Sequence, residues 1–223
     1  MKKYLHIMRT SSIFSGMTDE EILSILHCMD AKVLKRPRGS FILHGGQTTQ
    51  SMGLLLQGSG LIIQEDIWGR RNIIDIITPA DTFLEAFACT GNPLSISVAA
   101  ETDCEILMLN TERILHTCPT ACAHHTRVIG NLVETIARKT LRMNDKITHM
   151  SRRSTREKLL SYLSSESIRQ GSLCFTIPFD RQQLADFLCV ERSAMSAELS
   201  RLRKEGVLSC TRNRFQLFTS VTL

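Results

Sequence analysis

The sequence predicts an α+β fold in three parts: an N-terminal double-stranded β-roll, one long helix and a C-terminal winged helix-turn-helix. Three observations support this. Short β-rich runs alternate with turn signals between residues 31 and 109, and a helical apolar period then runs for about 30 residues. Residues 180–208 have the spacing of two short helices joined by a tight turn. We therefore expect domains at residues 1–117, 118–150 and 151–223.

The composition is that of a globular protein. Of the 223 residues, 43% are hydrophobic and 22% are charged, which excludes a disordered or collagen-like chain. No apolar run approaches the ~20 residues of a membrane span. The apolar stretch after Lys2 and Lys3 stops at Arg9, which argues against a signal peptide. We expect a cytoplasmic protein with no membrane partner.

The N-terminal part begins with one predicted helix, at residues 13–29, because Thr18 and Glu21 form a capping box ahead of an apolar face. The pattern then changes to short strands, separated by turn signals such as Gly45-Gly46. The expected strands are residues 41–43, 53–56, 61–64, 72–77, 95–99 and 105–109. Several short strands at this spacing are typical of an antiparallel barrel or roll.

Beyond Asn110 the period becomes helical, with a short helix at residues 112–117, a break or kink at Pro119, and a long helix to about residue 150. A helix of this length spans roughly 45 Å, more than a small barrel covers, so we expect a homodimer along it. The alternative is that the barrel of the same chain covers its apolar stripe. The expected dimer interface consists of Ile129, Leu132, Val133, Ile136, Met143 and Ile147.

The charge is uneven along the chain. Residues 1–150 hold 15 Lys and Arg against 15 Asp and Glu, whereas residues 151–223 hold 12 against 7. The last third therefore carries the whole net charge of +5. A basic module beside a neutral body indicates a polyanionic partner, most often nucleic acid; a solvated basic face is the alternative.

The C-terminal part has the features of a winged helix-turn-helix. Asp180 is a predicted helix N-cap, small Ala185 lies where two helices cross, and Gly206 closes the second helix, residues 192–204. Residues 207–210 and 215–218 predict a hairpin, the wing. Residues expected to face the bases of double-stranded DNA are Arg192, Ser193, Ser196 and Ala197, and residues expected to suit phosphate contacts are Arg181, Gln182, Arg212 and Arg214. The alternative for Ser193 and Ser196 is that they contact phosphates.

The order of these parts, and residues 180–208 (DRQQLADFLCVERSAMSAELSRLRKEGVL), resemble the Crp/Fnr family of bacterial transcription regulators. Residues 58–83 (GSGLIIQEDIWGRRNIIDIITPADTF) resemble that family's cyclic-nucleotide-binding-like roll. The resemblance implies a homodimer on a pseudo-palindromic DNA operator, with an effector or redox or metal signal acting through the roll. Activation would also need a contact with RNA polymerase. Well-known members of that family have Glu at the position of Ser193 and Arg at the position of Ala197. Because both residues differ here, the resemblance does not give the operator sequence.

The roll departs from the members that it resembles in one segment. Members that bind cyclic AMP have a Gly-Glu pair followed by an Arg-Ser pair, and the arginine neutralises the cyclic phosphate. Here Leu84 precedes Glu85, and Leu94 precedes Ser95. We therefore do not expect cyclic AMP as the effector. These four residues, with Thr140 of the long helix, are the candidate pocket for some other small molecule, or for none.

Cys118, Cys122 and His125 are the candidate metal site, because steps of 4 and 3 residues place them on one helix face. Two thiolates and an imidazole suit zinc, and Cys or His can be an axial haem ligand. A thiol redox switch and simple packing are the alternatives. The iron–sulfur cluster of oxygen-sensing members is not expected, since the first cysteine, Cys28, stands alone.

A second class of function is a thiol- or metal-dependent enzyme on the roll, with the C-terminal part as a docking domain. No Ser/His/Asp set, Gly-rich phosphate loop or H-E-x-x-H motif supports it. We therefore predict a regulator that is not an enzyme, and salt-sensitive DNA binding distinguishes the two classes.

Overall fold

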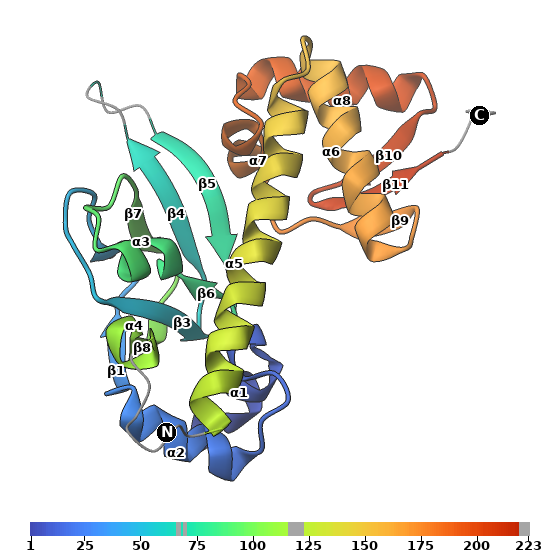
Figure 1. The fold of residues 1–223 in the computed structure, drawn as a ribbon. Helices are drawn as coiled ribbons and strands as arrows, with labels where there is room; N and C mark the ends of the chain where they lie inside the picture. Colours follow the sequence, from blue (N-terminus) through green and yellow to red (C-terminus); the bar gives the residue numbers. More distant parts are fainter. Residues whose placement is uncertain (66–67, 69–70, 116–122, 219–223) are drawn as a thin grey trace. The chain divides into compact units, whose positions relative to one another are not determined.

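The computed structural model describes residues 1–65, 68, 71–115 and 123–218. It divides into two compact units, the first made of Met1–Arg70 with Ile74–Thr140 and the second of Arg71–Ile73 with Leu141–Leu223. The division falls inside the long helix α5 (Ala123–Met150). The β-rich part, the long helix and the helix-turn-helix part confirm the predicted fold class (Figure 1).

The first unit starts with short helical segments, η1 (Lys2–Tyr4), α1 (Leu5–Thr10), η2 (Ser12–Phe14) and α2 (Asp19–Cys28). The predicted capping box of α2 is present: Thr18 Oγ1 accepts from the Glu21 N–H, and Glu21 Oε2 accepts from the Thr18 N–H at 2.8 Å. The sequence analysis missed α1, because a six-residue helix is too short to show an apolar period.

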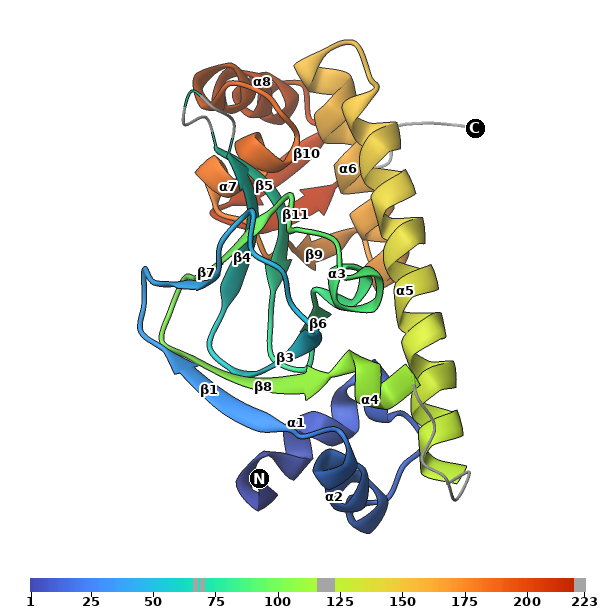
Figure 2. The same ribbon diagram turned by 60° about the vertical axis from the view of Figure 1, so that its left-hand side comes forward.

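Two four-stranded antiparallel sheets form the roll, in the orders β1-β8-β3-β6 and β2-β7-β4-β5. Figure 2 shows the strands beside the single turn of α4. The elements are β1 (Lys32–Arg36), β2 (Phe41–Leu43), β3 (Ser51–Gln57), β4 (Gly60–Glu65), β5 (Arg71–Ile77), β6 (Thr82–Phe83), α3 (Glu85–Thr90), β7 (Ser97–Ala100), β8 (Cys104–Asn110) and α4 (Thr111–Leu115).

All six predicted strands are present, with ends within two residues of the prediction. The elements β1, β6 and α3 were not predicted from the sequence. The sequence of β1, KVLKR, has three cations in five residues and is mostly exposed, so it lacks an apolar signal. It is held instead by its ladder with β8, from Lys32 opposite Met108 to Arg36 opposite Cys104.

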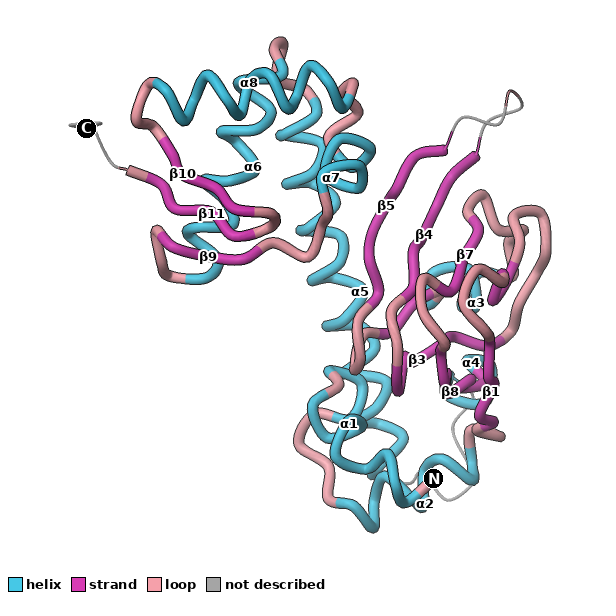
Figure 3. Tube along the Cα trace, turned by 180° about the vertical axis from the view of Figure 1, so that it is seen from behind, coloured by secondary structure: helices cyan, strands magenta, loops and turns pink. Residues whose placement is uncertain are grey.

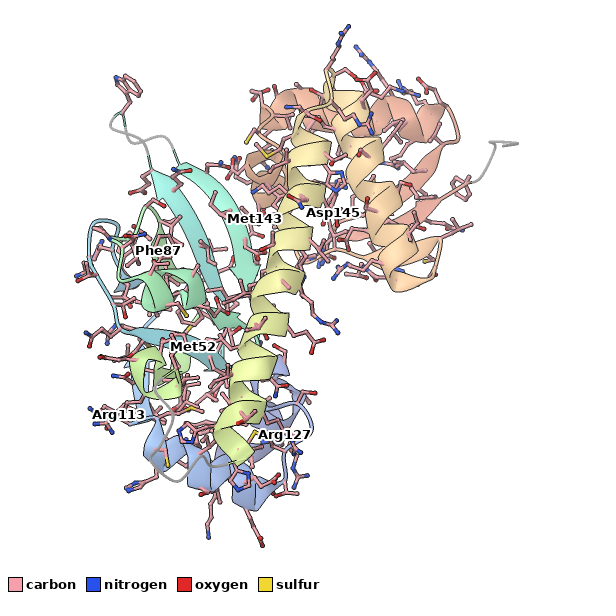
Figure 4. The ribbon with its side chains drawn as sticks, viewed as in Figure 1. Met52, Phe87, Arg113, Arg127, Met143 and Asp145 are labelled. Carbon is pink, nitrogen blue, oxygen red and sulfur yellow. The ribbon has the colours of Figure 1, made fainter. Side chains whose placement is uncertain are left out.

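Two apolar clusters fill the first unit. One includes Leu55, Phe83, Val98 and Ile106 from the strands of the roll. The other joins α1, α2, β3 and β8 to the first half of α5, and it includes Val128 and Leu132. Figure 4 marks Arg127 in the first turns of α5, where its Nη1 donates to the Gly16 carbonyl at 2.6 Å.

This second cluster corrects part of the predicted dimer stripe. Leu132 is only 2% exposed, and Ile129 and Ile136 pack against the same core, because α1 and α2 cover this side of α5. The prediction that Leu132 is free to contact a second copy is therefore wrong, and the same chain covers Ile129, Leu132 and Ile136 of the stripe. Val133 and Ile147, by contrast, are 63% and 62% exposed, and Met143, marked in Figure 4, is also exposed.

The second unit contains α6 (Thr155–Gln170), β9 (Cys174–Thr176), α7 (Arg181–Phe187), α8 (Arg192–Lys204), β10 (Leu208–Thr211) and β11 (Arg214–Leu217). Its sheet has the order β10-β11-β9 (Figure 3). Ala185 is fully buried, as expected of a residue where helices cross. The inner face of α6 consists of the buried residues Leu159, Tyr162, Leu163 and Ser167, whereas Ile168 is 79% exposed.

None of the helices in the described ranges has the length and apolar character needed to cross a bilayer.

Candidate nucleic-acid interface

Helix α7 has a well-formed start. The Asp180 carboxylate accepts from the Gln183 N–H at 2.8 Å, and the Gln183 side chain accepts from the Asp180 N–H at 2.8 Å. At its other end Cys189 adopts a left-handed conformation, with φ of 50°. This turn separates α7 from α8 and completes the predicted helix-turn-helix.

Helix α8 is fixed by apolar and ionic contacts. Met195, Leu199 and Leu202 are buried against the rest of the unit. Arg156 of α6 donates from Nη1 to Glu198 at 3.1 Å and from Nη2 to Glu205 at 2.6 Å. These contacts hold the C-terminal half of α8 and leave its first turns open to solvent.

The four residues expected to face DNA bases all lie on the exposed side of α8: Arg192, Ser193, Ser196 and Ala197. Within the described residues, no hydrogen bond or ion pair engages the Arg192 guanidinium. A surface depression of about 690 Å³ runs between α7 and α8, lined by Gln182, Asp186, Val190, Glu191, Arg192, Ser193 and Ser196. The structure thus brings Gln182 together with three of the expected base-reading residues.

Sequence reasoning did not predict three residues that line this surface, Asp186, Val190 and Glu191. Of these, Glu191 directly precedes Arg192. It is the N-cap of α8, and its Oε2 accepts from the Ala194 N–H at 2.9 Å and from the Ser193 hydroxyl. The Ser193 hydrogen bond, followed by those of the backbone N–H groups, lowers the pKa of Glu191 below its usual value. The available signal was an acid placed directly before the helix, a position that favours a capping carboxylate.

The predicted phosphate contacts divide into two groups. Arg212 and Arg214 are exposed in the turn and second strand of the wing, formed by β10 and β11, and Arg214 Nη2 donates to Cys174 Sγ at 3.6 Å. Arg181 is partly buried: its guanidinium lies over the Phe215 ring at 5.2 Å, and Nη2 donates to Cys210 Sγ at 3.2 Å. Arg181 therefore packs against the wing, and Arg212 and Arg214 are better placed to contact phosphates.

The five candidate effector residues do not line one enclosed site. Leu84 and Leu94 are buried in the core of the roll, whereas Ser95 and Thr140 are exposed. Glu85 is buried, and its Oε1 accepts from Lys139 Nζ of α5 at 2.7 Å. Lys139 was not predicted as a site residue, because it lies on the polar side of its helix and belongs to no recognisable motif.

The segment that contains Leu84 and Leu94 is buried and apolar. Leu84 keeps a left-handed backbone, with φ of 67°, but its side chain fills space in the core. Leu94 is apolar and only 3% exposed. The nearby cation, Lys139, is already neutralised by Glu85. The segment therefore lacks a free cation for an anionic ligand.

Cys118 and Cys122 of the candidate metal site lie outside the described residues. His125 is 2% exposed, and its Nδ1 finds no hydrogen-bond partner in the described ranges. His124 Nδ1 lies 3.3 Å from Glu21 Oε1. Among the residues that the structure describes, no three His, Cys, Asp or Glu side chains are grouped to hold a metal ion.

Comparison with known families identifies two domains in the chain. Residues 33–120 match the family described as cyclic nucleotide-binding domain, and residues 157–219 match the Crp-like helix-turn-helix domain. No curated protein sequence matches the chain at a significant level.

Solved structures share the whole fold at low sequence identity. The catabolite activator protein of Thermus thermophilus is 22% identical, with a TM-score of 0.53 over 93% of this chain and 94% of that one. The c-di-GMP responsive global regulator CLP of Xanthomonas campestris is 15% identical, with a TM-score of 0.69 over 91% and 100%. FixK2 from Bradyrhizobium japonicum is 17% identical, with a TM-score of 0.64 over 84% and 92%.

Proposed function

Because residues 33–120 match the cyclic nucleotide-binding domain family and residues 157–219 match the Crp-like helix-turn-helix, the chain belongs to the Crp/Fnr family of transcription regulators, and we propose that it regulates transcription as a cytoplasmic homodimer on a pseudo-palindromic DNA operator. Each copy inserts the N-terminal half of α8 into the major groove of one half-site. The wing adds phosphate contacts through Arg212 and Arg214.

The exposed start of α8, with its Arg192 side chain, is the observation that carries the proposal. The first turns of α8 are exposed, and the Arg192 guanidinium is not engaged by any described residue. An unpaired guanidinium at the start of a recognition helix suits the two acceptors of a guanine edge. The net positive charge of the C-terminal third supplies attraction to the phosphate backbone.

The homodimer is supported by the exposed face of α5. Val133, Ala137, Thr140, Asn144 and Ile147 are exposed at alternating steps of 4 and 3 residues. This is the spacing of a coiled-coil seam. A seam of small and polar residues with two apolar anchors fits a pair of closely spaced helices. We therefore place the interface on this face, which shares Val133 and Ile147 with the predicted stripe.

The signal that controls binding is proposed to be something other than cyclic AMP, since Leu94 is apolar and buried where cyclic-AMP-binding members have an arginine, and Lys139 is already paired with Glu85. The proposed site for a metal ion, a haem or a thiol redox switch consists of Cys118, Cys122 and His125. Whatever the signal, it must bind the DNA-competent arrangement more tightly than the other arrangement to change the occupancy of the operator.

Selection from a randomised DNA duplex library tests the proposal. The wild-type protein should enrich inverted half-sites with centres about 10 bp apart, or a multiple of it, because two reading helices contact the same side of DNA. The affinity of the enriched duplex is then measured for Arg192→Ala and Arg201→Ala. Arg201 is an exposed cation on the same helix, so the second variant removes the same charge away from the reading face.

We expect Arg192→Ala to lose about 1–3 kcal/mol of discrimination at one base position and Arg201→Ala to retain the wild-type preference. Equal sequence preference in wild type and Arg192→Ala would show that α8 does not read the bases through this residue. Failure of the wild type to enrich any sequence would contradict the proposed function.

A further inference from the structure

The N-terminus of α8 presents hydrogen-bond acceptors beside the donor groups of Arg192. The Ser193 hydroxyl donates to Glu191 Oε2, and the Ala194 N–H donates to the same oxygen. The other carboxylate oxygen, Oε1, accepts no hydrogen bond from any described residue. Both side chains are exposed and line the depression between α7 and α8.

The hydrogen bond from the Ser193 hydroxyl to Glu191 determines which hydrogen-bonding groups these two residues present to DNA. A serine hydroxyl has one hydrogen and two acceptor lone pairs. Because its hydrogen is directed at Glu191, Ser193 presents acceptors to solvent. An ionised carboxylate accepts hydrogen bonds and donates none. The hydrogen bonds that Glu191 receives keep its pKa low, so it is ionised at neutral pH.

The Glu191 carboxylate does not suit a contact with a DNA phosphate. A second carboxylate, that of Asp186, lines the same depression and accepts from Gln182 Nε2 at 2.8 Å. Two negative charges repel the phosphate backbone, while hydrogen-bond donors on base edges attract them. If α8 lies in the major groove, Glu191 must therefore face a base edge that offers a donor.

We propose that Glu191 and Ser193 form an acceptor pair that selects a cytosine, through its N4 amine, next to the guanine read by Arg192. The inference rests on the proposed function of α8. In the major groove guanine offers only acceptors, thymine an acceptor and a methyl group, and adenine a donor beside an acceptor. Cytosine offers the amine donor alone, so it is the base that meets two acceptors without repulsion.

Two substitutions test this assignment by selection on randomised duplexes. Glu191→Ser keeps a good N-cap and removes the carboxylate. Glu191→Gln keeps the shape of the side chain and adds two donors, a combination that matches adenine. Circular dichroism spectra that match the wild type establish that both variants are folded. Asp186→Asn is the matched control, because it removes an acid from the same depression outside α8.

The expected result is a cytosine preference in the wild type that falls at least tenfold in Glu191→Ser and changes to adenine in Glu191→Gln. Asp186→Asn should retain the cytosine. If Glu191→Ser keeps the cytosine and only binds all duplexes more tightly, the carboxylate acts through repulsion alone and the assignment is wrong. If the wild type selects no sequence, the proposed function fails, which is a different result.

Discussion

The Lys139 ammonium of α5 lies 2.7 Å from Oε1 of the buried Glu85 carboxylate, and it also donates to the Thr82 carbonyl. The contact ties the first turn of α3 to the long helix within the first unit. A buried carboxylate needs a compensating charge or donor, and Lys139 supplies both. The start of α3 is thus linked to α5 by an ion pair within the same chain.

Lys139→Met should destabilise the roll, because it leaves the Glu85 carboxylate buried without its partner. A loss of about 1–3 kcal/mol in the free energy of unfolding is expected, since an unsatisfied charged group costs at least this much. The measurement is denaturant unfolding followed by circular dichroism. The double variant Lys139→Met with Glu85→Gln should recover part of the loss, and a double variant as unstable as the sum of the singles would contradict the pairing.

The close approach of Gly53 to Phe83 gives a second prediction. The two residues are opposite each other on β3 and β6, and a Cβ on Gly53 would overlap the Phe83 ring. Gly53→Ala should therefore destabilise the protein by about 1–3 kcal/mol. Adding Phe83→Leu makes room for the methyl group, so the loss measured for Gly53→Ala by the same unfolding assay should shrink in that background. An equal loss in both backgrounds would show that the ring is not the cause.

The burial of His149 leads us to expect that the stability of the second unit depends on pH. It is buried, its Nδ1 lies 2.8 Å from Ser161 Oγ, and it lies edge-on to Tyr162. Burial lowers its pKa; Asp145 and Glu166 oppose the shift, whereas Arg152 adds to it. The unfolded state therefore binds a proton more readily, so stability is lost as the pH falls through the unfolded pKa, about 6.5.

The melting temperature of the wild type should accordingly fall between pH 7.5 and 5.5 by more than that of His149→Gln, which cannot gain the proton. Calorimetry at a series of pH values measures both. A wild type and variant with parallel pH profiles would rule out a contribution from this histidine.

The proposed dimer face predicts the effect of a charge on α5. Val133→Asp places a carboxylate at an exposed apolar position of the seam, and burying it against a second copy is unfavourable. The variant should sediment as a monomer at concentrations where the wild type is a dimer. Ile168→Asp makes the same change at an exposed apolar residue of α6 and should remain dimeric. Dissociation by both variants, or by neither, would place the interface elsewhere.

The sequence predicted most of the fold because its signals were local. The capping box at Thr18, the apolar period of α8 and the small Ala185 each concern residues within one or two turns. The strand β1 was not predicted because its order comes from pairing with β8, a ladder that runs from Lys32 opposite Met108 to Arg36 opposite Cys104. The local sequence of β1 does not reveal a pairing partner that lies so far away in the chain.

The site was predicted in part for the same reason. Arg192, Ser193, Ser196 and Ala197 share a face by helical period, which the sequence shows directly. The engagement of Arg181 by Cys210 and Phe215 depends on how the wing folds against α7, and the pairing of Lys139 with Glu85 joins residues far apart in the chain. The burial of Leu132 by α1 and α2 likewise needed the tertiary structure.

The most direct test of sequence-specific DNA recognition by α8 is a salt titration of binding, by fluorescence anisotropy, to the selected operator and to a scrambled duplex. The account predicts that both affinities fall with salt, with a log–log slope of about −0.9 per neutralised phosphate. It also predicts that the operator stays at least about 10³-fold tighter at physiological salt. Equal affinities for the two duplexes, or binding that does not respond to salt, would contradict it.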